Sequence, residues 1–247
     1  MGKIEDILDD FQKKFGIKPV PRKDIQTFST GFKEIDDALG IGGIPRGKTS
    51  EISGAPGTGK TILAYHMIRE AQTQGAIVMY VDAERAFDKN LAKRLGVDID
   101  SLLIVTPLIG EYAIQAIHAN LTYKLVDLII IDSMPALLPL EELRGESKAL
   151  TQTKLIGTFF RSLMEIVEAS NTALVCLNQV RHDFKLGGAT TPFNQIFGYF
   201  ASVRIHLTRV KSITRWRRVQ AYIVEANIYK NNWNQITKVN FELKVNF

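Results

Sequence analysis

The sequence predicts an α/β protein built on a mostly parallel sheet, with helices on both faces and an antiparallel extension at the C-terminal end. Strand-like runs separated by helix-patterned segments predict the parallel part: residues 49–53, 76–81, 102–105, 126–131 and 172–177. Such alternation of strands and helices is typical of a parallel sheet covered on both sides. The extension is predicted by residues 202–211, 218–229 and 238–245, which follow one another without intervening helices.

Length and composition are those of an ordinary globular protein. The 247 residues are enough for one large α/β domain, and the chain is 45% hydrophobic and 23% charged. Asp127 and Asp132 interrupt the longest apolar run, so no membrane span is expected. The N-terminus is charged rather than apolar, and the single Cys176 has no internal partner for a disulfide. A cytoplasmic protein is therefore expected.

The N-terminal residues 1–28 are predicted to be a separate oligomerisation unit ahead of a core over residues 29–247. Residues 4–15 have apolar side chains at helical spacing, and Gly16 can end this helix. The proline-containing residues 19–27 indicate an extended linker. Two interpretations stay open, because the helix could dock on an adjacent subunit or cover its own sheet. Residues 29–44 predict a capped helix that ends in glycines.

A glycine-rich segment between the first predicted strand and the helix over residues 62–74 fits the pattern G-x-x-x-x-G-K-[ST]. Glycines let backbone N–H groups curl around a triphosphate, and the following helix adds its positive N-terminus. Lys60 is expected to reach the β- and γ-phosphates, and Thr61 to offer a hydroxyl to Mg²⁺. The alternative is a plain glycine-rich turn. The predicted phosphate-binding loop consists of Gly54, Ala55, Pro56, Gly57, Thr58, Gly59, Lys60 and Thr61.

Polar residues follow three of the predicted strands, where ligands bind in parallel sheets. Asp132 is positioned to hold Mg²⁺ through water, Glu84 to orient an attacking water, and Gln179 to sense a γ-phosphate. Each residue alone could equally be a helix cap. Together with a complete phosphate loop they favour a nucleotide hydrolase over a protein that only binds the nucleotide.

The net charge of +5 is unevenly distributed along the chain. Residues 184–224 contain seven of the 31 Lys and Arg residues and no acidic residue, which leaves 24 basic against 26 acidic residues elsewhere. Nucleic acid is the expected partner of such a segment. The alternative is a solvated face of a β-hairpin.

Several segments together resemble the RecA recombinase family in its bacterial form. They are STGFKEIDDALGIGGIPRG ahead of the phosphate loop, VDAERAFD at 81–88, LGVDID at 95–100, VDLIIIDSMPALLP at 126–139, LNQVR at 177–181 and FASVR at 200–204. The resemblance implies a RecA-like ATPase core that binds ATP and Mg²⁺. It implies that Glu84 is the catalytic glutamate, that Asp132 is the Walker B carboxylate, and that Gln179 couples the γ-phosphate to DNA binding. It also implies that Asp88 lies near the adenine.

The resemblance further implies two DNA-binding loops, here residues 138–150 and 180–197. Lys154 and Arg161 are seven residues apart on the predicted helix over 149–167, so they share a face. Both match basic DNA contacts of the family, and two cations on one face can follow a phosphate backbone. Arg181 and Gln195 are the expected contacts in the second loop. An ordinary solvated helix face and a plain connector are the alternatives.

Four departures from the family pattern stand out. Pro192-Phe193-Asn194 replaces a Gly-Gly pair late in the second loop, and Leu91 replaces an aromatic residue that stacks on adenine. Only Lys230 lies near the position of two lysines that cross the subunit interface to the γ-phosphate. The family's separate C-terminal domain is not expected in this chain.

The resemblance implies a DNA-dependent ATPase that forms a homo-oligomeric helical filament on single-stranded DNA and pairs it with double-stranded DNA in recombination and repair. Two other functions stay open: a regulatory paralogue that binds ATP and a recombinase without strand exchange, and a ring-forming DNA translocase.

Overall fold

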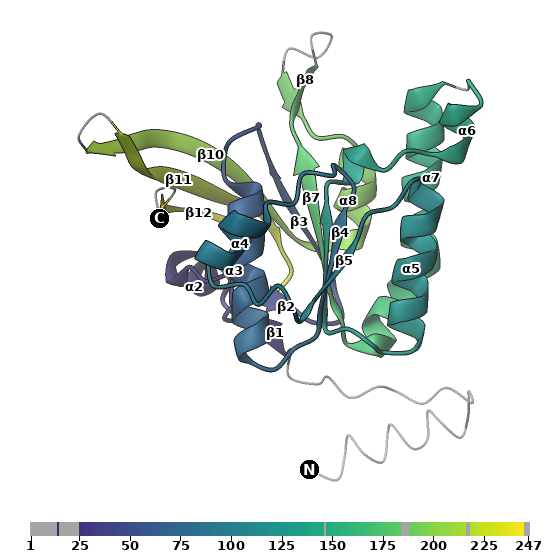
Figure 1. Ribbon diagram of the computed structural model, residues 1–247, viewed down its shortest axis with the longest axis horizontal. Coiled ribbons are helices and arrows are strands. Elements are labelled where there is room, and N and C mark those ends of the chain that lie inside the picture. Colours follow the sequence, from purple (N-terminus) through teal and green to yellow (C-terminus); the bar gives the residue numbers. More distant parts are fainter. Residues whose placement is uncertain (1–13, 15–24, 146, 184–187, 216–217, 245–247) are drawn as a thin grey trace.

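The computed structural model describes residue 14 and residues 25–145, 147–183, 188–215 and 218–244 (Figure 1). Apart from residue 14, the predicted N-terminal helix over residues 4–15 lies outside the described residues, as does most of the linker that follows it. The predicted division at residue 28 stays a prediction.

One eight-stranded sheet forms the centre of the protein, in the order β12-β11-β10-β3-β7-β6-β4-β5. Neighbouring strands from β10 to β5 are parallel, whereas β11 and β12 are added antiparallel. The predicted mostly parallel sheet with an antiparallel C-terminal extension is therefore confirmed. The strands are β3 (Thr49–Gly54), β4 (Val78–Asp82), β5 (Leu102–Val105), β6 (Leu128–Asp132), β7 (Ala173–Gln179), β10 (Ala201–Arg215), β11 (Arg218–Asn231) and β12 (Thr237–Lys244).

Helices cover both faces of this sheet, as predicted (Figure 1). Along β6 the side chains alternate between two cores: Leu128 and Ile130 pack on the side of α3, while Ile129 and Ile131 pack on the side of α7. Because both faces are buried, the central strands are continuous apolar runs. One face carries α2 (Lys33–Leu39), α3 (Lys60–Thr73) and α4 (Lys89–Arg94), and the other carries α5 (Gly110–Thr122), α7 (Lys148–Ser170) and α8 (Asn194–Phe200).

The helix predicted over residues 29–44 is shorter in the structure, where it covers only Lys33–Leu39. Ser29 and Thr30 do not cap its first turn. Their hydroxyls donate instead to the carboxylate of Asp36, at 2.5 and 2.7 Å. The helix ends at Gly40, whose φ of 73° is left-handed, so the predicted glycine stop is confirmed.

Short elements complete the fold. β1 (Thr27–Phe28) pairs with β2 (Ile44–Pro45), and β8 (Arg181–Asp183) pairs with β9 (Gly188–Thr190). The turn η1 (Met134–Ala136) and the helix α6 (Leu140–Leu143) connect β6 to α7. β8 and α6 both lie at the end of the sheet where the parallel strands finish (Figure 1). In the part of the chain that the structure describes, none of the helices combines the length and apolar character needed to cross a membrane.

Candidate functional site: a nucleotide site beside a polar loop

The phosphate loop connects β3 to α3, and its backbone needs glycine at two places. Gly57 and Gly59 have φ values of 76° and 97°, a left-handed backbone conformation that residues with a Cβ rarely adopt. A Cβ on Gly59 would also lie 2.1 Å from a methyl carbon of Leu243. The loop is closed from within, since Lys60 Nζ donates to the carbonyl oxygens of Gly54 and Ala55 at 2.9 and 3.0 Å.

The environment of Lys60 favours an anionic ligand. Burial lowers the pKa of its ammonium group, and the nearby carboxylates of Asp132 and Glu84 only oppose that effect. In the described hydrogen bonds of Lys60, the ammonium group has only neutral carbonyl oxygens as acceptors. A phosphate oxygen would supply the compensating charge, and Ala55, Pro56 and Gly57 leave the outer side of the loop exposed to solvent. These residues fit a nucleotide phosphate group.

Two oxygen donors next to the loop suit a magnesium ion. Thr61 Oγ1 lies 2.8 Å from Asp132 Oδ2, and both are hard oxygen groups of the kind that Mg²⁺ prefers. The buried hydroxyl of Tyr80 donates to the same Asp132 oxygen at 2.6 Å. Burial raises the pKa of the Asp132 carboxyl, and the hydrogen bonds from Tyr80 and Thr61 counteract that rise. The predicted pair of metal-site residues, Thr61 and Asp132, is thus brought together.

The structure also places Glu84 and Gln179 side by side. Glu84 Oε1 accepts a hydrogen bond from Gln179 Nε2 at 2.8 Å and another from the hydroxyl of Ser133. Ser133 follows Asp132 through a cis peptide bond. The backbone N–H groups of Ala83 and Glu84 donate to the Asp132 carbonyl, so the ends of β4 and β6 are tied together. The carboxylate that is predicted to orient water therefore lies beside the predicted γ-phosphate sensor.

Two other predicted nucleotide contacts have protein partners in this structure. Asp88 Oδ1 accepts from the backbone N–H groups of Asn90 and Leu91, both at 2.9 Å, and so caps α4. This is the helix-cap geometry that is common where a chain leaves a strand. Lys230, on β11, donates to the carbonyl of Gly198 at 2.7 Å. The adenine and cross-subunit roles of Asp88 and Lys230 stay predictions.

Among the predicted DNA contacts, Lys154 and Arg161 lie on the exposed face of α7, opposite the buried Ile156, Phe159, Phe160 and Leu163. Lys154 forms an ion pair with Glu141 of α6 at 2.8 Å. The only described hydrogen bond of the Arg161 side chain is a long one, 3.5 Å from Nη2 to Thr158 Oγ1. Its guanidinium is thus well placed to meet an external phosphate.

The second predicted DNA loop contains a short hairpin. β8 and β9 pair antiparallel, with Arg181 opposite Thr190 and Asp183 opposite Gly188. Asn178 and Gln179 precede β8, and α8 follows β9. Arg181 is in β8, its side chain being outside the described part, and Gln195 is exposed at the start of α8. Phe193 has a φ of 61°, a left-handed conformation that is costly for a bulky residue. Glycine would adopt it readily, so Phe193 holds this conformation at a cost in strain.

One cation of the basic segment is not available to a partner. Arg204 belongs to the basic segment over residues 184–224, yet its side chain is only 6% exposed and pairs with the fully buried Glu51 at 2.5 Å. β10 runs parallel to β3 with these two residues in register, which brings them together inside the protein. Arg209 and Lys211 are exposed on the same strand, so the described excess of positive surface begins beyond Leu207.

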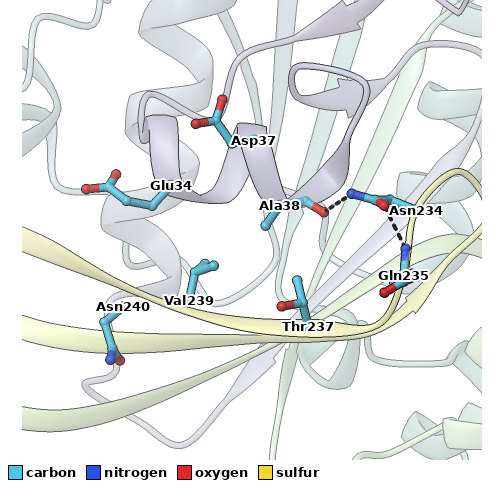
Figure 2. A pocket seen from close by; sticks show the side chains of 8 residues that line it. All are labelled: Glu34, Asp37, Ala38, Asn234, Gln235, Thr237, Val239 and Asn240. Carbon is cyan, nitrogen blue, oxygen red and sulfur yellow. Dashed lines mark hydrogen bonds between the residues drawn. The ribbon is translucent and has the colours of Figure 1, made fainter.

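A separate open cavity of about 610 Å³ lies between α2 and β12 (Figure 2). Its lining includes the acidic Glu34 and Asp37 on one side and the amides Asn234, Gln235 and Asn240 on the other. None of its lining residues belongs to the phosphate loop. The candidate nucleotide site is thus defined by its chemistry at the strand ends and not by this cavity.

Comparison with known proteins identifies the family. The RecA N-terminal domain matches residues 3–245 of the chain. The chain belongs to the RecA family. Protein RecA of Aquifex pyrophilus is 36% identical over 245 residues, which are 94% of this chain and 70% of that protein. Protein RecA of Aquifex aeolicus is 36% identical over 92% of this chain and 70% of its own length. Protein RecA of Mesomycoplasma hyopneumoniae is 34% identical, over 92% and 71%.

RecA-family membership makes this chain a relative of recombination and DNA-repair proteins that bind ATP and DNA. The family pattern did not reveal every residue of the site. Tyr80 reads as an ordinary apolar-strand residue until β4 and β6 pair in parallel and direct its hydroxyl to Asp132. The only signal in the sequence was a hydroxyl-bearing aromatic residue inside a strand, since a buried Tyr requires a hydrogen-bond partner.

Proposed function

We propose that this RecA-family chain is a DNA-dependent ATPase that assembles as a helical filament on single-stranded DNA and promotes homologous pairing and strand exchange. The observation that carries the proposal is the contact between Glu84 and Gln179. It joins a water-orienting carboxylate to the residue from which the second loop begins. A change at the γ-phosphate can therefore reach the DNA-binding side of the molecule through one hydrogen bond.

Each residue of the site has a distinct task in ATP hydrolysis. The phosphate loop and Lys60 bind the β- and γ-phosphates, and Thr61 and Asp132 would hold Mg²⁺, which neutralises charge that develops on the phosphate oxygens. Glu84 orients the attacking water and accepts its proton. Gln179 has to exchange its bond with Glu84 for one with the γ-phosphate, which frees the carboxylate for the water.

Arg161 supports the DNA part of the proposal. We expect Arg161→Ala to weaken binding of single-stranded oligonucleotides of every sequence alike, because a guanidinium that meets a phosphate reads no bases. The slope of log affinity against log salt should become shallower by roughly 0.7, the value for one phosphate contact on a single strand. Fluorescence anisotropy at several salt concentrations measures both effects.

Arg94→Ala is the matched control, because Arg94 is exposed on α4 on the opposite side of the sheet. It should leave the affinity and the slope unchanged. A slope in Arg161→Ala equal to that of the unmodified protein would exclude a phosphate contact at this position.

An exposed apolar surface supports the self-association part of the proposal. Large apolar side chains around the edge strand β5 and the helix α5 are solvent-exposed, and Leu108 and Tyr123 are exposed by 66% and 73%. Exposed apolar side chains of this kind are available to a neighbouring subunit. Its members are Ile77, Leu103, Leu108, Tyr112, Tyr123 and Leu125.

The predicted N-terminal helix provides a test of assembly. Removal of residues 1–25 is expected to abolish filaments on single-stranded DNA and to leave the core folded, because the two described cores are formed by residues from Phe28 onward. Electron microscopy with ATP detects the filaments, and circular dichroism follows the fold. Normal filaments after the truncation would refute the assigned role of this segment.

A regulatory relative that binds ATP without exchanging strands is the second candidate, favoured by Phe193 in a left-handed conformation where the family has glycine. A strand-invasion assay separates the two candidates. Joint molecules formed by the purified protein, ATP and homologous DNA support the recombinase, whereas ATP hydrolysis without joint molecules supports the regulator.

A further inference from the structure

A buried group of polar side chains lies beneath the second loop, and the proposed chemistry does not use it. Glu51 of β3 is its centre, and Asn178, Arg204 and Tyr229 surround that carboxylate; we call these four residues the Glu51 cluster. Asn178 Nδ2 donates to Glu51 Oε1 at 2.7 Å, and Arg204 Nε and the Tyr229 hydroxyl donate to Oε2 at 2.5 and 3.0 Å. The Arg204 guanidinium also lies 4.7 Å from the centre of the Tyr229 ring.

The cluster holds both ends of the second loop. At the beginning of the loop, Asn178 directly precedes Gln179, and its Nδ2 also donates to the carbonyl of Pro192 at 2.8 Å. At the end of the loop, Arg204 Nη2 donates to Asn194 Oδ1 at 2.8 Å. The two stems of the β8–β9 hairpin are therefore fastened to one carboxylate.

The same carboxylate is on the strand that leads into the phosphate loop. Gly54, three residues after Glu51, accepts from Lys60 Nζ at 2.9 Å and from the backbone N–H of Val180 at 3.3 Å. A bound phosphate would compete with this carbonyl for Lys60 Nζ, and loss of that bond would change the hydrogen bonds at the junction of β3 and β7. The Glu51 cluster crosses the same two strands, because Glu51 is three residues before Gly54 and Asn178 is two residues before Val180.

One buried atom indicates that the cluster has a second arrangement. Asn178 is fully buried, yet its Oδ1 has no hydrogen-bond partner among the described residues. A buried acceptor without a donor is unfavourable, and the amide cannot flip without losing both bonds made by Nδ2. A shift of the second loop that brings a donor to this oxygen would be favoured.

We infer that the Glu51 cluster is the positioning element that couples nucleotide binding to the placement of the second loop, and hence to the affinity for the single-stranded DNA backbone. This inference rests on the proposed function, because it assumes that the second loop contacts DNA. The cluster touches neither ligand. It transmits the change because Glu51 and Arg204 are opposite one another on neighbouring strands and allow few alternative geometries.

Tyr229→Phe tests the inference with the smallest possible change. It removes the hydroxyl that bonds to Glu51 and keeps the ring beneath Arg204. Tyr222→Phe is a matched control, since Tyr222 is on the same strand and its ring lies 4.8 Å from the guanidinium of Arg209. No hydrogen bond of its hydroxyl is among those described.

The measurement is the ratio of affinities for a fluorescent single-stranded oligonucleotide with a non-hydrolysable ATP analogue and with ADP. We expect the ratio to fall about three- to tenfold in Tyr229→Phe, the size of one typical net hydrogen bond, and to be unchanged in Tyr222→Phe. The affinity for the analogue without DNA should stay the same in both variants. By linkage, the gain in analogue affinity that DNA produces must fall by the same factor.

The possible outcomes are distinct. A lower ratio in Tyr229→Phe alone, with equal unfolding midpoints for all three proteins, supports the coupling role. An unchanged ratio in Tyr229→Phe overturns the inference and leaves the proposed function standing. A ratio of one in the unmodified protein overturns both. A lower ratio accompanied by weaker analogue binding without DNA shows a purely structural role and also overturns the inference.

Discussion

Glu84→Gln is expected to bind ATP normally and to hydrolyse it at least ~100-fold more slowly than the unmodified protein. Glutamine preserves the size of the side chain and an oxygen that can accept from Ser133 and Gln179, the two partners of Glu84. It lacks the charge needed to orient water and take up a proton. Phosphate release measured with saturating DNA gives the turnover, and fluorescent-nucleotide titration gives the affinity.

Glu168→Gln is the corresponding control, because Glu168 is 70% exposed on α7. It pairs with Lys48, which precedes β3 and is therefore away from the carboxyl ends of the strands. Its turnover should match that of the unmodified protein. Near-normal hydrolysis in Glu84→Gln would show that another group orients the water, and the assignment of Glu84 would fail.

Arg204→Ala should produce the largest loss of stability. Glu51 has no exposed surface, so removal of its cationic partner leaves an uncompensated charge inside the protein. Such changes cost about 3–5 kcal/mol, because the buried ion has lost both its solvation and its partner. Urea unfolding followed by circular dichroism measures the free energy of unfolding.

Arg209→Ala distinguishes this effect from the loss of a cation over an aromatic ring. Arg209 lies 4.8 Å from the Tyr222 ring but is exposed, so its removal should cost about 1 kcal/mol or less. If both variants lost the same small amount, the buried ion pair would contribute no more than a surface contact.

The sequence predicted the sheet, and it named residues that the structure brings together at the candidate nucleotide site, because both depend on local patterns. The glycines and Lys60 of the phosphate loop occur at fixed spacing, and polar residues such as Asp132 end apolar strands at the edge where parallel strands place their ligands. The predicted bounds of these strands differ from the observed ones by at most two residues, and this difference does not change which side chains meet at the edge of the sheet. The contact between Glu84 and Gln179 follows from this arrangement.

The Glu51 cluster could not be predicted in the same way. Glu51 and Arg204 are 153 positions apart, and only the pairing of β10 with β3 makes them neighbours. In the sequence, Arg204 reads as one more cation of a basic segment, and the FASVR segment that contains it does not show that the side chain is buried. The hairpin in the second loop was missed for a related reason, because β8 and β9 are three residues each and carry no apolar alternation.

The hydroxyl of Tyr80 has a consequence for how a cation would enter the site. With Thr61 it fixes one oxygen of Asp132 from two directions, so the carboxylate can hardly rotate. The loss of rotational freedom that normally accompanies metal coordination has then already occurred during folding. A magnesium ion that arrives with its nucleotide would find the oxygen atoms of Asp132 and Thr61 already in fixed positions.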